Sequence, residues 1–217
     1  MNEPAVRACA PLIVATWGAG GPPDETRPEP LWVFAYGSLM WEPNFVCAEV
    51  RPALLRGYHR ALCILSIRNR GTETKPGLVL GLDRGGSCAG RALRVAPGHY
   101  ATTLAYLEQR EMSTAAYRPK LVPVRLDGGE SVRALAFVAE PRHRQYVGTL
   151  APEEAARLVR QGRGSYGASL DYLRNVIAHL DRIGIADGPL HRVLALAEVA
   201  GEASGGHAGD AARSAEP

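Results

Sequence analysis

The chain has 217 residues, of which 46% are hydrophobic and 22% are charged, and its formal net charge is +3. These values are typical of a soluble globular protein that is long enough to bury a sizeable core. The small net charge, with no run of basic residues, argues against nucleic-acid binding. No apolar stretch approaches the roughly 20 residues that a membrane-spanning helix needs.

The cysteines and the N-terminus bear on the cellular compartment. Four cysteines are widely spaced and form no C-x-x-C pair: Cys9, Cys47, Cys63 and Cys88. This spacing predicts buried thiols in place of a zinc site or a redox dithiol. A single positive charge precedes the short apolar run 11–17, which makes a poor secretory signal. We therefore expect a cytoplasmic protein.

The expected strands follow an N-terminal arm and lie between residues 31 and 139. Residues 1–30 are rich in Pro, Gly and Ala and predict a disordered arm. The six apolar or aromatic residues 31–36 predict a fully buried strand, because a half-exposed strand would alternate. Further strands are expected within 50–67, as two strands with a bulge or bend between them at Gly57, and at 77–82, 88–95, 120–126 and 132–139. Asp127-Gly128-Gly129 predicts a hairpin between the last two.

One expected helix lies between strands and the others follow them. The helices are expected at 97–111, from Pro152, at 170–180 and at about 189–199. This order predicts an α+β fold with a small mixed or antiparallel β-barrel-like sheet and flanking helices. We expect one domain over residues 31–200 and a disordered tail over 201–217.

The buried strand 31–36 ends at a glycine that suits a ligand site. Gly37 permits a sharp turn and close approach to backbone N–H groups, and Ser38 adds a hydroxyl at the same point. Two interpretations remain open here, namely a strand end with an ordinary turn, or a loop that cradles a substrate.

Glu111 is the best candidate for acid–base chemistry. The expected helix 97–111 carries apolar residues at spacings of four and three, at Tyr100, Leu104 and Leu107. The next step of four is Glu111, so a carboxylate falls on the stripe that faces the core. Burial raises the pKa of a carboxylate, as a general base near neutral pH requires. The alternatives are that the helix ends earlier, or that Glu111 forms a structural ion pair with Arg110 or Arg118.

Several segments resemble one enzyme family. Residues 34–41, Phe-Ala-Tyr-Gly-Ser-Leu-Met-Trp, closely resemble the aromatic-x-Tyr-Gly-Ser-Leu-x-Trp signature of the ChaC-type gamma-glutamylcyclotransferases. Residues 106–112 match the family's Tyr-Leu-x-x-Arg-Glu segment, and Tyr117 matches a tyrosine that follows it. Residues 145–148 resemble the family's Tyr-Leu-Gly segment, and 162–173 resemble its Gly-x-x-Gly-x-x-x-x-Tyr-Leu helix start. The resemblance covers roughly residues 31–200.

The resemblance implies an enzyme that cleaves glutathione to 5-oxoproline and cysteinylglycine without a cofactor or metal. Within it Glu111 would be the catalytic residue. The substrate-binding residues that it implies are Phe34, Ala35, Tyr36, Gly37, Ser38, Leu39, Tyr117 and Tyr146. The expected partner is this small molecule alone, with no nucleic acid or membrane, and the chain is expected to act as a monomer.

The reaction fits these parts, because the nucleophile belongs to the substrate. The α-amino group of a gamma-glutamyl amide can close a five-membered ring on its own γ-carbonyl, so positioning and proton transfer suffice. Two alternatives stay open: a cyclotransferase for other gamma-glutamyl amines, and a noncatalytic gamma-glutamyl-binding protein. The loop Arg68-Asn69-Arg70 either binds the glycyl carboxylate or is simply solvated.

Overall fold

The computed structural model describes residues 11–24 and 29–205. Contacts divide the chain into two compact units. The single domain predicted over residues 31–200 stays a prediction. The first unit runs to Ile64 and resumes at Leu80–Gly148, and the second consists of Leu65–Val79 and the chain from Thr149 onward. The arm residues 1–10 and 25–28 and the tail residues 206–217, which were expected to be disordered, lie outside the described residues.

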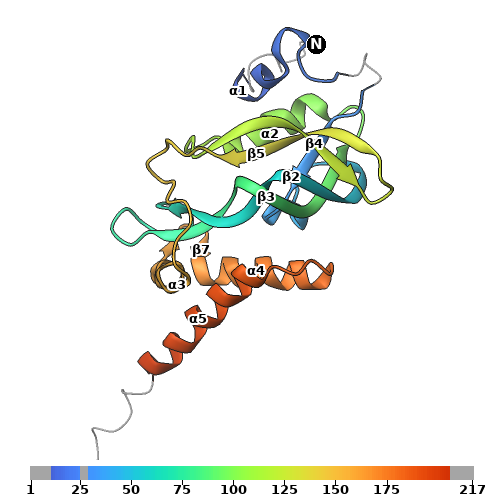
Figure 1. Ribbon diagram of the computed structural model, residues 1–217. Helices are drawn as coiled ribbons and strands as arrows, with labels where there is room; N and C mark the ends of the chain where they lie inside the picture. The colour runs from blue at the N-terminus through green and yellow to red at the C-terminus, as the bar shows by residue number, and fades with distance from the viewer. Residues whose placement is uncertain (1–10, 25–28, 206–217) are drawn as a thin grey trace, which may run out of the picture. The chain divides into compact units, whose positions relative to one another are not determined.

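The first unit is built on a closed five-stranded barrel with the strand order β1–β3–β2–β4–β5 (Figure 1). The strands are β1 (Trp32–Ala35), β2 (Cys47–Ser66), β3 (Gly77–Val95), β4 (Tyr117–Leu126) and β5 (Ser131–Ala139), and the far ends of β2 and β3 belong to the second unit. Strand β1 pairs antiparallel with β3 and parallel with β5. The mixed barrel with its helices confirms the predicted α+β class.

Two of the barrel strands are longer than the sequence predicted. The bend expected at Gly57 lies inside one continuous strand, and the turn expected at Gly85-Gly86 does not end β3, so seven expected segments form five strands. Gly57, Gly85 and Gly86 take positive φ values of 83°, 95° and 66° inside continuous strands. Glycine adopts such angles without a steric cost, and in a strand it marks a bend or bulge as often as an end.

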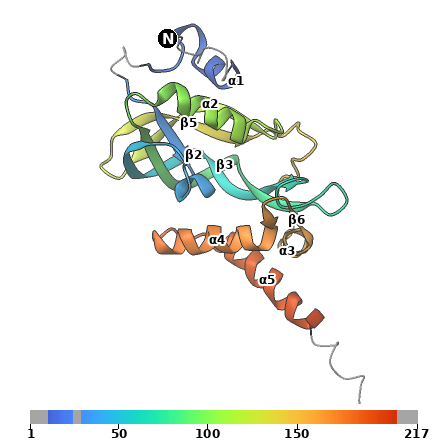
Figure 2. The ribbon, with the colours of Figure 1, turned by 180° about the vertical axis from the view of Figure 1, so that it is seen from behind.

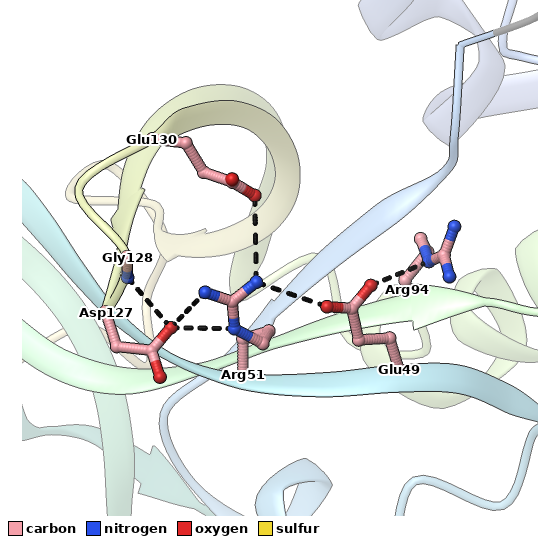
Figure 3. A network of polar contacts seen from close by, with 6 residues as sticks. All are labelled: Glu49, Arg51, Arg94, Asp127, Gly128 and Glu130. Atoms are coloured by element: carbon pink, nitrogen blue, oxygen red, sulfur yellow. Dashed lines mark hydrogen bonds and ion pairs between the residues drawn. The ribbon is translucent and has the colours of Figure 1, made fainter.

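A network of partly exposed charges joins the strands at one side of the barrel (Figure 3). Arg51 on β2 donates to Asp127 at 2.7 Å and to Glu49 at 3.2 Å, and Glu49 pairs with Arg94 on β3 at 3.0 Å. Asp127 begins the predicted turn between β4 and β5, where Gly129 has a φ of 90°. The predicted hairpin is therefore confirmed, and Arg51 ties it to β2.

Helix α2 (Tyr100–Glu111) lies between β3 and β4 in the chain, and the N-terminal arm packs on it. The arm forms α1 (Pro11–Val14) and the short 3-10 helix η1 (Ala15–Gly20), beside α2 and β4 respectively (Figures 1 and 2). Ile13 has no exposed surface. The carboxylate of Glu108 on α2 accepts the N–H groups of Leu12 and Ile13. Residues 11–20 are thus folded, which differs from the disorder that their composition predicted.

The second unit contains three mutually packed helices and a two-stranded sheet. These elements are α3 (Pro152–Gln161), β6 (Arg163–Gly164), β7 (Gly167–Ala168), α4 (Ser169–Arg182) and α5 (Gly188–Gly205). The helices predicted at these places are confirmed, and α5 extends beyond its expected end. A Cβ added at Gly162 would lie 2.2 Å from the Cα of Gly77, so this glycine allows two backbones to touch.

Two further expectations concern thiols and membranes. Cys47, Cys63 and Cys88 are free thiols, and the last two are buried, whereas Cys9 lies outside the described residues. Burial and, to a smaller extent, the nearby charge of Asp83 raise the pKa of Cys63 to about 12, so this thiol is inert near neutral pH.

Within the described part of the chain, no helix has the length and apolarity to cross a membrane.

Candidate active site

The bend after β1 is held by its own backbone. Ser38–Met40 form the short 3-10 helix η2, in which the N–H of Met40 donates to Gly37 O at 2.9 Å. The N–H groups of Trp41 and Glu42 both donate to Ser38 O. These carbonyls therefore point into the turn. The first N–H groups of such a turn have no acceptor inside it, so those of Ser38 and Leu39 are directed out of it.

A buried arginine fixes the first peptide plane of this bend. Arg60 on β2 is 8% exposed, and its guanidinium donates to Tyr36 O and to Ala89 O, both at 2.6 Å. In a trans peptide the carbonyl and the following N–H point in opposite directions. Because Tyr36 O faces Arg60, the N–H of Gly37 faces away from it. The sequence analysis missed Arg60, although an arginine inside a largely apolar strand was a usable signal.

Glu111 is the last residue of α2 and lies on the predicted stripe. Tyr100, Leu104 and Leu107 are buried, and the Glu111 side chain is 18% exposed. Burial raises the pKa of Glu111 above its ordinary value of 4.5, although the charge of Arg110 acts in the opposite direction. The carboxylate is therefore a stronger base than an exposed one.

The ion pair that the sequence left open is also present. Arg110 Nε lies 3.0 Å from Glu111 Oε1, whereas Arg118 pairs with Glu140 at 3.2 Å. The same Arg110 guanidinium donates to Ser38 Oγ at 2.8 Å. A single guanidinium group thus lies between Glu111 and the bend, although Arg110 and Ser38 are 72 residues apart in the sequence. This arrangement brings two of the predicted site elements together.

The three predicted tyrosines each donate their phenol hydrogen to another protein group. The bonds are Tyr36 to Phe137 O at 3.0 Å, Tyr117 to Leu80 O at 2.6 Å, and Tyr146 to both carboxylate oxygens of Asp83 at 3.0 Å. Burial and the bond to Asp83 raise the pKa of Tyr146 to about 12. With their hydrogens donated, the phenol oxygens offer a ligand lone pairs, which suit an ammonium or amide N–H.

The remaining predicted residues near the bend have buried side chains. Phe34 and Ala35 have no exposed surface, and Leu39 is 7% exposed. A Cβ on Gly90 of β3 would lie 2.4 Å from Ala35 O and 2.9 Å from the Phe34 ring, so β1 and β3 are in close contact here. The side chains of Phe34 and Ala35 therefore belong to the core that carries the bend.

The loop Arg68-Asn69-Arg70 lies in the second unit, where its backbone carbonyls accept hydrogen bonds. Ser165 N donates to Arg68 O at 2.9 Å and Tyr166 N donates to Asn69 O at 2.8 Å. Arg70 donates to the carbonyls of Tyr166 and Ala168 and stacks over Tyr172. Arg70 is thus a structural link within the second unit. Arg68 and Asn69 are exposed, as a solvated loop would be.

Comparisons with known proteins show what this chain is similar to. Residues 31–200 match a family model described as ChaC-like protein. The glutathione-specific gamma-glutamylcyclotransferase of Escherichia coli K12 is 36% identical over 172 residues, which cover 79% of this chain and 73% of the relative. The human glutathione-specific gamma-glutamylcyclotransferase 1 is 36% identical over 157 residues and 70% of each chain. A solved yeast gamma-glutamyl cyclotransferase specific to glutathione shares the fold, with a TM-score of 0.73 at 20% identity over 79% of this chain and 96% of its own.

Proposed function

Because the chain belongs to the ChaC family, we propose that it is a glutathione-specific gamma-glutamylcyclotransferase that cleaves glutathione to 5-oxoproline and cysteinylglycine. The bacterial and human relatives are named as glutathione-specific enzymes, which supports glutathione as the substrate. The observation that carries the proposal is the largely buried carboxylate of Glu111, joined through Arg110 to the Ser38 bend.

The reaction exchanges one C–N bond for another. The substrate α-nitrogen bonds to the γ-carbonyl carbon, and the bond from that carbon to the cysteinyl nitrogen breaks. From its ammonium form the α-nitrogen loses two protons in all, and the departing nitrogen gains two and leaves as an ammonium. No water, metal or external nucleophile enters this balance. Holding the two ends of the gamma-glutamyl group together supplies proximity, whose contribution can reach about 7–11 kcal/mol in well-oriented systems.

Glu111 is assigned the proton transfers. At neutral pH the substrate amino group is mostly ammonium and cannot attack, so a base must first remove its proton. The burial that raises the pKa of Glu111 brings its basicity closer to that of the working pH. Once protonated, the same carboxyl group can donate to the departing amine.

The substrate contacts are assigned to the bend and the tyrosines. Outward N–H groups of Gly37, Ser38 and Leu39 suit the substrate α-carboxylate or the oxyanion that develops on the γ-carbonyl. The phenol oxygens of Tyr117 and Tyr146, which donate their hydrogens elsewhere, suit substrate N–H groups.

Incubating the purified protein with glutathione tests the proposal. We expect equal amounts of 5-oxoproline and cysteinylglycine, and Glu111→Gln is expected to lower kcat by roughly 10²–10⁴-fold, the range for general acid–base residues. Glu108→Gln is the matched control on the same helix, because it makes the same substitution at a carboxylate that bonds the arm, and its amide oxygen still accepts one of the two arm N–H groups. No product from folded protein, or full turnover in Glu111→Gln, would overturn the assignment.

Two alternatives from the sequence have their own outcomes in this assay. Faster turnover of gamma-glutamyl-alanine than of glutathione would indicate a cyclotransferase for other gamma-glutamyl amines. Calorimetric binding of glutathione with no turnover would indicate a noncatalytic binding protein.

We also propose that the protein is cytoplasmic, acts as a monomer and needs no cofactor. Size-exclusion chromatography tests the oligomeric state, and an assay after dialysis against a chelator tests the need for a metal cofactor.

A further inference from the structure

Arg110 makes four hydrogen bonds, two within its own helix and two to the bend after β1. Its guanidinium donates to Glu111 Oε1 at 3.0 Å, to Ser38 Oγ at 2.8 Å, to the carbonyl of Glu42 at 3.0 Å and to the hydroxyl of Tyr106 at 2.6 Å. The side chain is 22% exposed. One group therefore connects the end of α2 with both ends of the bend after β1.

The shape of the guanidinium determines how the two site residues are held. It is planar and rigid, and its Nε and Nη2 atoms are separated by a single carbon. Because Nε binds Glu111 and Nη2 binds Ser38, the carboxylate and the hydroxyl are kept at a fixed separation. The bonds from Nη1 to Glu42 and Tyr106 keep the plane from rotating. A lysine could not provide this geometry, since its ammonium is a point charge.

The bond to Ser38 also orients the serine hydroxyl. A guanidinium has donors only, so Ser38 Oγ must accept, and the single hydroxyl hydrogen points away from Arg110. Ser38 is thereby a donor toward any group bound at the bend. A donor suits an anion, and the anion that a gamma-glutamyl substrate carries next to its reacting amine is the α-carboxylate.

We propose that Arg110 is a positioning residue that couples the two halves of the site: it holds Glu111 for proton transfer and turns the Ser38 hydroxyl toward the substrate α-carboxylate. This inference rests on the proposed function, since it assigns roles within that reaction. It goes beyond the ion pair alone, because it makes substrate binding at Ser38 and proton transfer at Glu111 depend on one side chain.

The charge of Arg110 gives a measurable consequence at Glu111. Arg110 is the charged group bonded to this carboxylate, and Arg110 in turn bonds Tyr106 on the same helix and Ser38 and Glu42 of the bend. Burial raises the pKa of Glu111, and Arg110 opposes the rise. Removing the cation should therefore move the acid limb of the kcat profile to higher pH, which a purely structural role would not do.

Kinetics of variants across pH test the proposal. We expect Arg110→Gln to raise KM, to lower kcat/KM by at least about tenfold (about 1.4 kcal/mol), and to shift the acid limb upward. Arg110→Lys should leave the limb near its wild-type position, since the charge remains, while KM stays raised because the fork to Ser38 is lost. Ser38→Ala should raise KM without moving the limb, and its effect should shrink in the Arg110→Gln background.

The controls separate this inference from the function on which it rests. Arg157→Gln removes an arginine that pairs with Glu154 on an exposed face, and it should leave all these parameters unchanged. Wild-type protein without product, or an active Glu111→Gln variant, refutes the function itself. An active wild type and inactive Glu111→Gln, together with a wild-type KM and pH profile in Arg110→Gln, refutes only the role of Arg110. If Arg110→Gln does not fold, a wild-type KM in Arg110→Lys has the same meaning.

Discussion

At the scale of single residues, Glu111 connects the chemistry of the site to the stability of the protein. Its pKa in the folded protein is raised above 4.5 by burial, so the folded state binds this proton more readily than the unfolded state does. The protonated group therefore stabilises the protein at low pH, and that contribution is lost as pH rises through the folded-state pKa.

We expect the wild type to lose stability relative to Glu111→Gln as pH rises from about 4.5 to neutrality, because glutamine has no charge to bury. Urea unfolding of both proteins at several pH values in this window measures the difference. A difference that stays constant, or that changes in favour of the wild type as pH rises, contradicts the raised pKa.

The position of Glu111 could be predicted from spacing, whereas its surroundings could not. A step of four from Leu107 sufficed to place the carboxylate on the buried stripe. Arg60 and Asp83 come from strands whose pairing brings them to Tyr36 and Tyr146, and no local pattern contains that information.

At the scale of elements, the structure differs from the sequence-based expectations where one local sequence pattern is compatible with two different structures. A glycine between apolar runs separates two strands in one protein and bends a single strand in another, and only the neighbouring strands of the barrel decide between these outcomes. The Pro- and Gly-rich arm is a second example. Its composition predicts disorder, yet Ile13 is buried within the first unit and Glu108 accepts two of the arm's N–H groups.

This packing predicts that the arm contributes to stability through one side chain. Ile13→Ala should lower the free energy of unfolding by about 2–5 kcal/mol, the usual cost of truncating a buried isoleucine. The neighbouring Leu12 is 57% exposed, so Leu12→Ala should change it by no more than about 0.5 kcal/mol. Urea unfolding of the two variants measures the contrast. Equal effects would mean that the arm does not pack on α2 in solution.

At the scale of the whole molecule, the chain builds two compact units from interleaved segments. The second unit takes Leu65–Val79 from the middle of the chain and combines it with the segment from Thr149, while Leu80–Gly148 returns to the first unit. The family match over residues 31–200 includes segments of both. Composition along the chain could not show this division, because it arises from contacts between segments that are distant in the sequence.

The glycines of the second unit show where those segments meet. A Cβ at Gly162 would lie 2.2 Å from Gly77 Cα and 2.5 Å from Arg70 O, all backbone atoms that cannot rotate aside. The φ of Gly162 is −74°, which any residue adopts, so the restriction is one of space alone. The segments 65–79 and 149–182 can therefore approach this closely only with a glycine at position 162.

We expect Gly162→Ala to loosen the second unit, because overpacking against fixed backbone costs about 1–3 kcal/mol or more. Hydrogen exchange followed by mass spectrometry should show faster exchange concentrated in 65–79 and 149–182. Gly188→Ala is the control, since a Cβ there meets nothing within 4 Å and the residue has no positive φ. Unchanged exchange in Gly162→Ala would mean that these two segments are not in backbone contact, and the second unit would then lack the packing that joins its separate pieces of chain.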